Sequence, residues 1–220
     1  HIQAEVWSRR LEFDATKLER APITSRCSSQ VVSLARSIDA LAHERQALLP
    51  VALLDGDSWS AGNLDSILGD NRSRCDELRH QMVALQEELD WLIYAAYRLL
   101  NAQDPPLAYQ IQPLFPEHRP FEILLGRAVA AGEQPPHWFD AMQRTPATEI
   151  PSTYSEETRR RIQSRIELIQ QEPNLALLEA PECKRKWEPF DWEKEVQEAA
   201  WSWLGDRVEE AGRAAGGLPP

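Results

Sequence analysis

The sequence predicts a mainly α-helical protein, and three observations support this fold class. Two long stretches carry apolar residues at alternating spacings of three and four, a rhythm typical of paired helices. Segments rich in glycine and proline separate these stretches from shorter amphipathic ones nearer the C-terminus. Strand signals are sparse. We therefore expect a long antiparallel helical hairpin followed by a smaller helical C-terminal subdomain, with little strand.

Composition sets the outer limits of this prediction. A chain of 220 residues can bury one sizeable core or two small ones, and 42% hydrophobic residues with eight Trp favour a folded body. No apolar run approaches the roughly 18 to 20 residues that span a bilayer. The net charge is −11, so bulk electrostatics do not favour wrapping around DNA. Any nucleic-acid contact would be local.

The first segment, residues 1–24, reads as extended or irregular. The spacing of Trp7, Leu11 and Phe13 indicates a last strand and the segment that leaves it. The chain begins without Met and without the apolar core of a signal peptide. We therefore expect it to be a part of something longer.

The predicted hairpin occupies residues 25–112. Ser25, Ser28 and Ser29 are candidate N-caps, and Pro50 marks the end of the first helix. A glycine-containing connection with at most one short helical turn is expected over 51–71. Each helix carries one apolar seam. The seam of the first helix consists of Cys27, Val31, Leu34, Ile38, Leu41 and Leu48, and Arg45 fills the one position in it that is polar. The seam of the second helix consists of Cys75, Leu78, Met82, Leu85, Leu89, Leu92, Ala96 and Leu99.

The second helix is expected to end near Asn101 and Asp104-Pro105-Pro106. Enzymes that methylate an exocyclic amine use Asp/Asn-Pro-Pro followed by an aromatic residue, which stacks on the flipped base. Leu107 stands in the aromatic position, and no Gly-x-Gly loop occurs in the chain. We interpret Asp104-Pro105-Pro106 as a helix terminator.

The C-terminal subdomain is expected over 113–220. Short helices are predicted at 121–131 and 136–144, and a helix capped near Ser155 presents three isoleucines on one face. The last helix is expected to start at Asp191 and to run to about Glu210. Its apolar stripe holds Trp192, Val196, Ala199 and Trp203.

Motifs for catalysis and metal binding are missing from the sequence. Cys27, Cys75 and Cys183 fit neither a disulfide framework nor a metal site, and we expect reduced thiols in a cytoplasmic protein. The five histidines form no ligand cluster, and no Gly-x-Ser-x-Gly or P-loop occurs. We therefore assign no catalytic, cofactor-binding or metal residue, and no membrane partner.

Two basic runs are candidate nucleic-acid contacts. They are Arg159-Arg160-Arg161 and Lys184-Arg185-Lys186, with Lys17 as a further candidate. Acidic or apolar helix follows each run, so a solvated helix face or cap is the alternative interpretation. Trp187, Trp192 and Trp203 fit a core better than a base-stacking platform, since two of them share one helical stripe.

Three stretches of the sequence resemble a known family. They are MVALQEELDWLIYAAYRLL, FEILLGRAVAAGEQPPHWFDAMQRTPATEIP and RRIQSRIELIQQEPNLALLEAPECKRKWEPFDWEKEVQEAAWSWLGDR, and together they lie within about residues 80–207. They are similar to segments of PglX-type site-specific DNA adenine-N6 methyltransferases of phage-defence (BREX, phage growth limitation) systems. FDATKLERAPI in the first 24 residues also resembles the exit from the target-recognition region of these enzymes.

This resemblance implies that the chain is the C-terminal region of such an enzyme. The parent would transfer a methyl group from S-adenosylmethionine to adenine N6, with the catalytic motif and the cofactor loop upstream of this chain. The fragment alone would then be inactive, would hold no cofactor, and would clamp DNA or dock partner phage-defence proteins. A stand-alone acidic helical adaptor or DNA mimic is the alternative, and an independent hydrolase or metal enzyme has no supporting motif.

Overall fold

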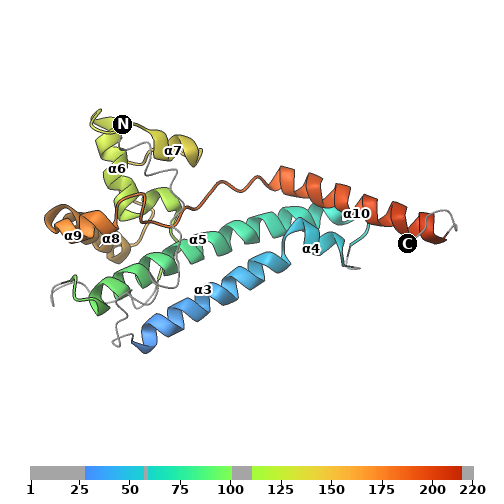
Figure 1. The fold of residues 1–220 in the computed structure, drawn as a ribbon, viewed down its shortest axis with the longest axis horizontal. Helices are drawn as coiled ribbons and strands as arrows, with labels where there is room; N and C mark the ends of the chain where they lie inside the picture. Colours follow the sequence, from blue (N-terminus) through green and yellow to red (C-terminus); the bar gives the residue numbers. More distant parts are fainter. Residues whose placement is uncertain (1–27, 57–58, 101–110, 215–220) are drawn as a thin grey trace, which may run out of the picture.

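The computed structural model describes residues 28–56, 59–100 and 111–214, and in these ranges the regular structure is helical. The predicted mainly α fold class is confirmed (Figure 1). The segment 1–24 with Lys17, Ser25, Cys27 and Asp104-Pro105-Pro106 lies outside these residues. The helices are α3 (Ser29–Ala47), α4 (Pro50–Leu54), α5 (Leu64–Ala96), α6 (Pro120–Ala130), α7 (His137–Ala141), α8 (Glu156–Gln171), α9 (Pro173–Leu178) and α10 (Trp192–Ala214), with a 3-10 turn at Pro116–His118.

Helix α3 packs along the first part of α5 in the antiparallel sense. The side chain of Asn71 donates to the carbonyl oxygen of Leu48 at 3.0 Å, and Arg74 Nη2 lies 2.7 Å from Glu44 Oε1. Further along, Ile38 and Met82 belong to one buried cluster. Positions that rise along α5 thus meet positions that fall along α3.

The connection expected over 51–71 is shorter than predicted. Pro50 begins α4 as its first residue instead of only ending the previous helix, and α5 already starts at Leu64. Gly69 lies inside α5, where a Cβ would meet nothing within 4 Å. An exposed glycine costs a helix about 1 kcal/mol relative to alanine, which the remaining turns of a 33-residue helix easily tolerate.

The end of α5 is also set differently from the prediction. The helix ends at Ala96, before Asp104-Pro105-Pro106, and Arg98 takes a left-handed conformation with φ of 59°. The amide of Leu99 donates to the carbonyl of Tyr94 at 2.9 Å, and that of Arg98 donates to Ala95 at 2.9 Å. This pair of bonds is a Schellman motif, which satisfies the last carbonyls without proline.

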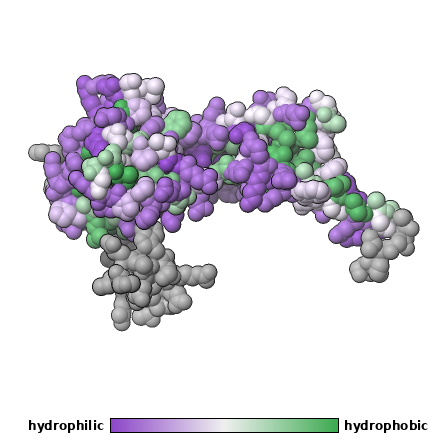
Figure 2. Space-filling model, turned by 90° about the horizontal axis from the view of Figure 1, so that it is seen from above, coloured by the Kyte–Doolittle hydropathy of each residue, from purple (hydrophilic) through white to green (hydrophobic). Residues whose placement is uncertain are grey.

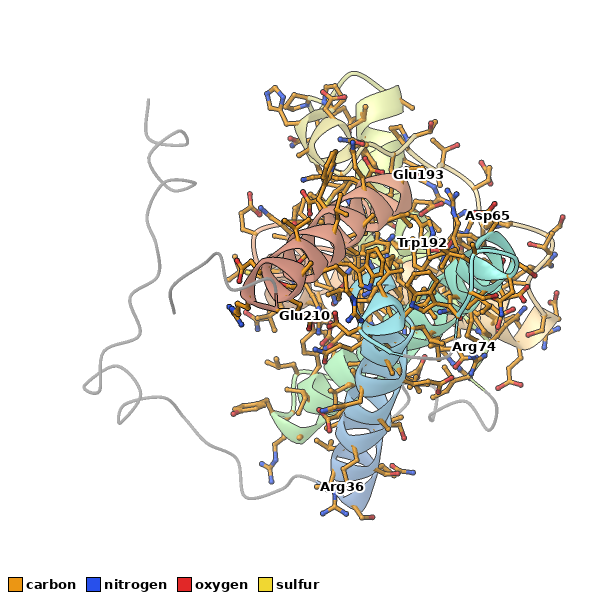
Figure 3. All side chains as sticks on the ribbon, turned by 90° about the vertical axis from the view of Figure 1, so that its right-hand side faces the viewer. Arg36, Asp65, Arg74, Trp192, Glu193 and Glu210 are labelled. Carbon is orange, nitrogen blue, oxygen red and sulfur yellow. The ribbon has the colours of Figure 1, made fainter. Side chains whose placement is uncertain are left out.

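Helix α10 packs on α4 at the other end of the molecule (Figures 1 and 3). As predicted, α10 starts directly after Asp191, whose carboxylate accepts a hydrogen bond from the Lys194 amide at 3.1 Å. Trp192 and Ala199 are buried, and Trp192 points toward α4 and α5 in the end-on view (Figure 3). Trp203 meets Trp59 edge to face with 5.4 Å between ring centroids.

Helices α6 and α8 cover the second part of α5. Here the predicted seam of α5 is only partly buried, because a second face turns inward toward these helices. The contact between α6 and the segment after α7 is close, since a Cβ on Gly126 would lie 2.4 Å from the carbonyl oxygen of Ala147. The main core unites α3, α5, α6 and α8 through Ile38, Met82, Val83, Ala84, Leu114, Ile123, Tyr154, Ile162, Ile166 and Trp187.

None of the helices that the structure describes combines the length and the apolar character that crossing a bilayer requires.

Candidate functional site

The first basic run lies on the first turns of α8. Ser155 caps this helix, because its hydroxyl accepts from the Thr158 amide at 3.2 Å. Arg160 is exposed and Arg159 is half-buried, and both pair with Glu156, at 2.9 and 2.7 Å respectively. These pairs join residues three and four apart, so they neutralise the helix surface locally and contribute little stability.

Arg161, the third residue of this run, points inward. Its guanidinium is 11% exposed and lies 2.9 Å from Glu157 and 3.6 Å from Glu88. A side chain in this position faces α5 and not a surface ligand.

An open groove runs beside the exposed part of the run, between α6 and α8. Its charged lining is balanced, with three arginines against three glutamates, so it offers a phosphate no net attraction. The lining residues are Arg127, Glu149, Ile150, Glu156, Arg159, Arg160, Gln163, Ser164 and Glu167.

The second basic run divides between the interior and the surface. Lys184 is buried, with its ammonium 2.6 Å from Asp90, 2.8 Å from Glu179 and 3.6 Å from Glu87. Arg185 is exposed and its guanidinium stacks on the Trp187 ring at 4.6 Å. Lys184 is therefore held by three carboxylates and is not presented to a surface ligand.

Lys184 is one member of a larger buried charge cluster that sequence analysis did not predict. The cluster joins α5, α6, α8 and the extended segment that leads from α9 to α10 (Figure 1). Each member lies within 4 Å of at least one residue of opposite charge, so no buried charge among them is left without a partner. The ion pairs form two groups, which the charge of Arg119 acting on Glu87 links: Glu87, Glu88, Asp90, Arg161, Arg165, Glu179 and Lys184 in one, and Arg119, Glu122 and Arg144 in the other.

Arg165 connects α8 to α5 within this cluster. Its Nη2 donates to Glu88 at 2.8 Å, and its guanidinium stacks on Trp91 at 4.9 Å from the ring centroid. The indole of Trp91 in turn donates to Glu87 at 2.9 Å. Arg165 thus combines an ion pair with a ring contact, a geometry that lysine would not reproduce.

Burial and neighbouring charge act in opposition on the ionisable groups of the cluster. Burial alone lowers the pKa of Lys184, but Glu87, Glu179 and Asp90 outweigh it, so this pKa lies above its usual value. Burial raises the pKa of Glu87, and Lys184 and Arg165 reverse the shift so that this pKa is lowered. Burial and the charge of Glu87 raise the pKa of Glu179, the carboxylate that also accepts from the Tyr94 hydroxyl at 2.7 Å.

The three stretches that carry the family resemblance meet in this cluster. The first stretch supplies Glu87, Glu88 and Asp90, and the second supplies Glu122. The third supplies Arg165, Glu179 and Lys184, among others. All three stretches that carry the resemblance therefore contribute residues to the contacts that hold the helices together.

A sequence signal for the buried carboxylates exists on α5. Val83, Glu87 and Trp91 follow one another at spacings of four, so Glu87 occupies a slot between two buried apolar residues on one helical face. A glutamate in such a slot is either paired or protonated.

A histidine pair lies beside the cluster, around the partly exposed ring of Phe115. The rings of His80 and His118 lie 4.0 and 5.5 Å from the Phe115 ring, centroid to centroid. Tyr154 Oη accepts from the Phe115 amide and lies 2.8 Å from His118 Nδ1, a hydrogen bond in which either group can be the donor. Burial lowers the pKa of both histidines, which favours their neutral rings.

Within the described ranges, no group of three or more His, Cys, Asp or Glu side chains has an arrangement that could hold a metal ion. Of the two cysteines in these ranges, Cys75 is buried in the α3–α5 contact and Cys183 is exposed.

The last helix presents two apolar faces. One packs on α4 through Trp192 and Ala199. The other, which we call the outer stripe, consists of Trp201, Leu204 and Val208, with 66%, 45% and 61% of their surface exposed. The outer stripe lies roughly half a turn around the helix from the packed face.

Fold and site together define an acidic, all-helical domain whose described charges mostly pair with one another. The chain belongs to a family described as a domain of unknown function, DUF7008, which matches residues 82–215. Over 212 residues, 94% of this chain, it is 36% identical to a protein of Streptomyces coelicolor named adenine-specific methyltransferase PglX. The resemblance to PglX predicted from the sequence is thereby confirmed. The chain spans 17% of the length of that relative, and no solved structure matches it.

Proposed function

We propose that this chain is a non-catalytic helical module of a site-specific adenine-N6 DNA methyltransferase of a phage-defence system, and that it docks other parts of that enzyme or partner defence proteins. The observation that carries the proposal is the 36% identity, over 94% of the chain, to part of an adenine-specific methyltransferase. S-adenosylmethionine and DNA would be bound by the parent enzyme in the cytoplasm. The C-terminal position of the module within that enzyme is part of the proposal.

Docking is favoured over DNA clamping because basic residues of both runs already pair with carboxylates of the same chain. Arg159 and Arg160 share Glu156, Arg161 faces Glu88, and Lys184 is buried among carboxylates. A phosphate contact would have to displace these partners. The outer stripe of α10, in contrast, offers apolar surface without any rearrangement.

Calorimetric titration tests the non-catalytic role. The 220-residue chain is expected to show no heat of binding with S-adenosylmethionine, while the longer protein binds it and methylates adenine. Binding by the 220-residue chain alone would contradict the proposal. A full reading frame without an Asn/Asp-Pro-Pro-aromatic motif would instead favour the stand-alone acidic adaptor.

DNA clamping is the second candidate, and the exposed arginines test it. Changing Arg159 and Arg160 to Ala in the longer protein, with Arg161 kept because it pairs with Glu88 in the interior, is expected to leave DNA affinity unchanged. If these residues contact phosphate, affinity falls equally for all sequences, and the salt slope drops by about one for each lost contact. The matched control is Arg207→Ala, on α10 away from the run.

A further inference from the structure

The outer stripe of α10 has the pattern of a helix-pairing surface. Trp201, Leu204 and Val208 follow one another at spacings of three and four, which places them on one face. Three such positions are the anchors that an amphipathic helix uses when it lies against another helix or in a groove. Hydrophobic residues reach the surface at the end of the molecule where α4 and α10 lie (Figure 2).

The charge around the stripe restricts its partner. The sequence of α10 holds six acidic and three basic residues, a net charge of −3. By helical spacing, Glu198 and Glu209 border one side of the stripe, and both side chains are more than 60% exposed. They pair with Lys194 at 3.7 Å and with Arg213 at 2.9 Å on the same helix, so the border owes its negative character to the net charge of −3 that α10 keeps after these pairs are counted. A helix with Lys or Arg beside its apolar seam complements this border, whereas an acidic helix is repelled.

A second copy of the chain fits this surface poorly. Pairing two outer stripes would remove on the order of 700 Å² from water, below the roughly 1,200 Å² of a stable interface. Each copy would also bring the same −3 helix and the same −11 chain toward the other. Both the area and the charge therefore disfavour a homodimer through this face.

A segment of the same polypeptide needs less contact area than a second copy of the chain, and it can carry the opposite charge. The chain spans 17% of the length of its methyltransferase relative, so most of such a protein lies elsewhere in the sequence. A tethered segment acts at an effective concentration in the millimolar range, so a small apolar contact suffices to hold it. We propose that a basic-flanked amphipathic helix from another part of the longer methyltransferase covers the outer stripe. This inference rests on the proposed function.

Cysteine labelling tests the cover directly. Leu204→Cys reports on the stripe, and Asp206→Cys on the same helix is the control outside it. Maleimide labelling, read peptide by peptide by mass spectrometry, is compared between the 220-residue chain and the longer protein. We expect Leu204→Cys to react at least tenfold more slowly in the longer protein, and Asp206→Cys to react equally in both.

Equal rates for Leu204→Cys in the two proteins would overturn the proposal. Protection that instead grows with the concentration of the 220-residue chain would assign the stripe to a second copy, and would overturn it too. Glu198→Lys with Glu209→Lys is expected to reduce the protection severalfold, and unchanged protection would refute the basic flank. If Leu204→Cys disturbs folding of the longer protein, slower hydrogen exchange of the wild-type amides over 201–211 gives the same readout.

The labelling result is independent of catalysis. A longer protein that protects Leu204→Cys but does not methylate adenine would contradict the proposed function alone. One that methylates adenine and leaves the stripe open would contradict only the covered stripe.

Discussion

Replacing Lys184 by Met removes the one ammonium that three carboxylates of the buried charge cluster share. Asp90 is 23% exposed and can be hydrated after the change. Glu87 keeps the Trp91 indole and a distant Arg165, and Glu179 keeps only the Tyr94 hydroxyl. Two buried carboxylates thus lose a charged partner.

The expected loss follows from these contacts. A charge-assisted hydrogen bond contributes about 1.5–3 kcal/mol, and breaking a buried ion pair costs about 3–5 kcal/mol in total. We expect Lys184→Met to lower the free energy of unfolding by about 3–5 kcal/mol at pH 7. The matched control, Lys194→Met, removes an exposed ammonium 3.7 Å from Glu198 and should cost less than about 1 kcal/mol.

Urea unfolding followed by circular dichroism measures both variants. Without Lys184, burial raises the pKa of Glu87 above that of the unfolded chain, and the already raised pKa of Glu179 rises further, so the native state binds more protons on acidification. The deficit of Lys184→Met should therefore shrink between pH 7 and pH 5. The proposed role of Lys184 would be refuted if Lys184→Met lowered the free energy of unfolding no more than Lys194→Met does. It would also be refuted if the destabilisation by Lys184→Met were the same at pH 7 and pH 5.

Further predictions concern backbone positions and the histidine pair. Gly126→Ala should destabilise the chain by about 1–3 kcal/mol, because the new Cβ would collide with the carbonyl oxygen of Ala147. Gly69→Ala should stabilise it by up to about 1 kcal/mol, since the Cβ there meets nothing. Thermal unfolding measures both variants. Arg98→Gly should add about 1 kcal/mol by relieving the left-handed conformation, and no gain in urea unfolding would contradict the Schellman end of α5. His118 has a lowered pKa, so it contributes stability above pH 6.5 that is lost as pH falls through its folded-state pKa. The stability difference between pH 7.5 and 5.5 should shrink in His118→Asn, and an unchanged difference would contradict a neutral His118 ring in the folded chain.

The helices were predictable where local signals agree. The starts of α8 and α10 follow from Ser155 and Asp191, because a capping side chain acts within three residues of itself. The start and end of α5 were mispredicted. Gly69 reads as a break although an exposed helical turn tolerates it, and Arg98 carries no sign of its left-handed conformation.

Apart from Glu87, which lies between Val83 and Trp91 on one apolar face, the buried charge cluster could not be predicted from local patterns. Glu88 reads as a solvated residue until Arg165 is placed beside it, and 77 positions separate the two in the sequence. The same holds for Lys184, which lies 94 positions from Asp90. A basic run thus looks like a phosphate contact in the sequence, although its first residue belongs to the interior.

The position of α10 on α4 sets how much of the chain must be present for α10 to keep its packing surface. The family match starts at Met82, in the middle of α5, while α4 lies upstream at Pro50–Leu54. A chain cut at Met82 would keep half of α5 and would leave Trp192 and Ala199 without the helix they pack on. The unit that folds is therefore longer than the matched segment.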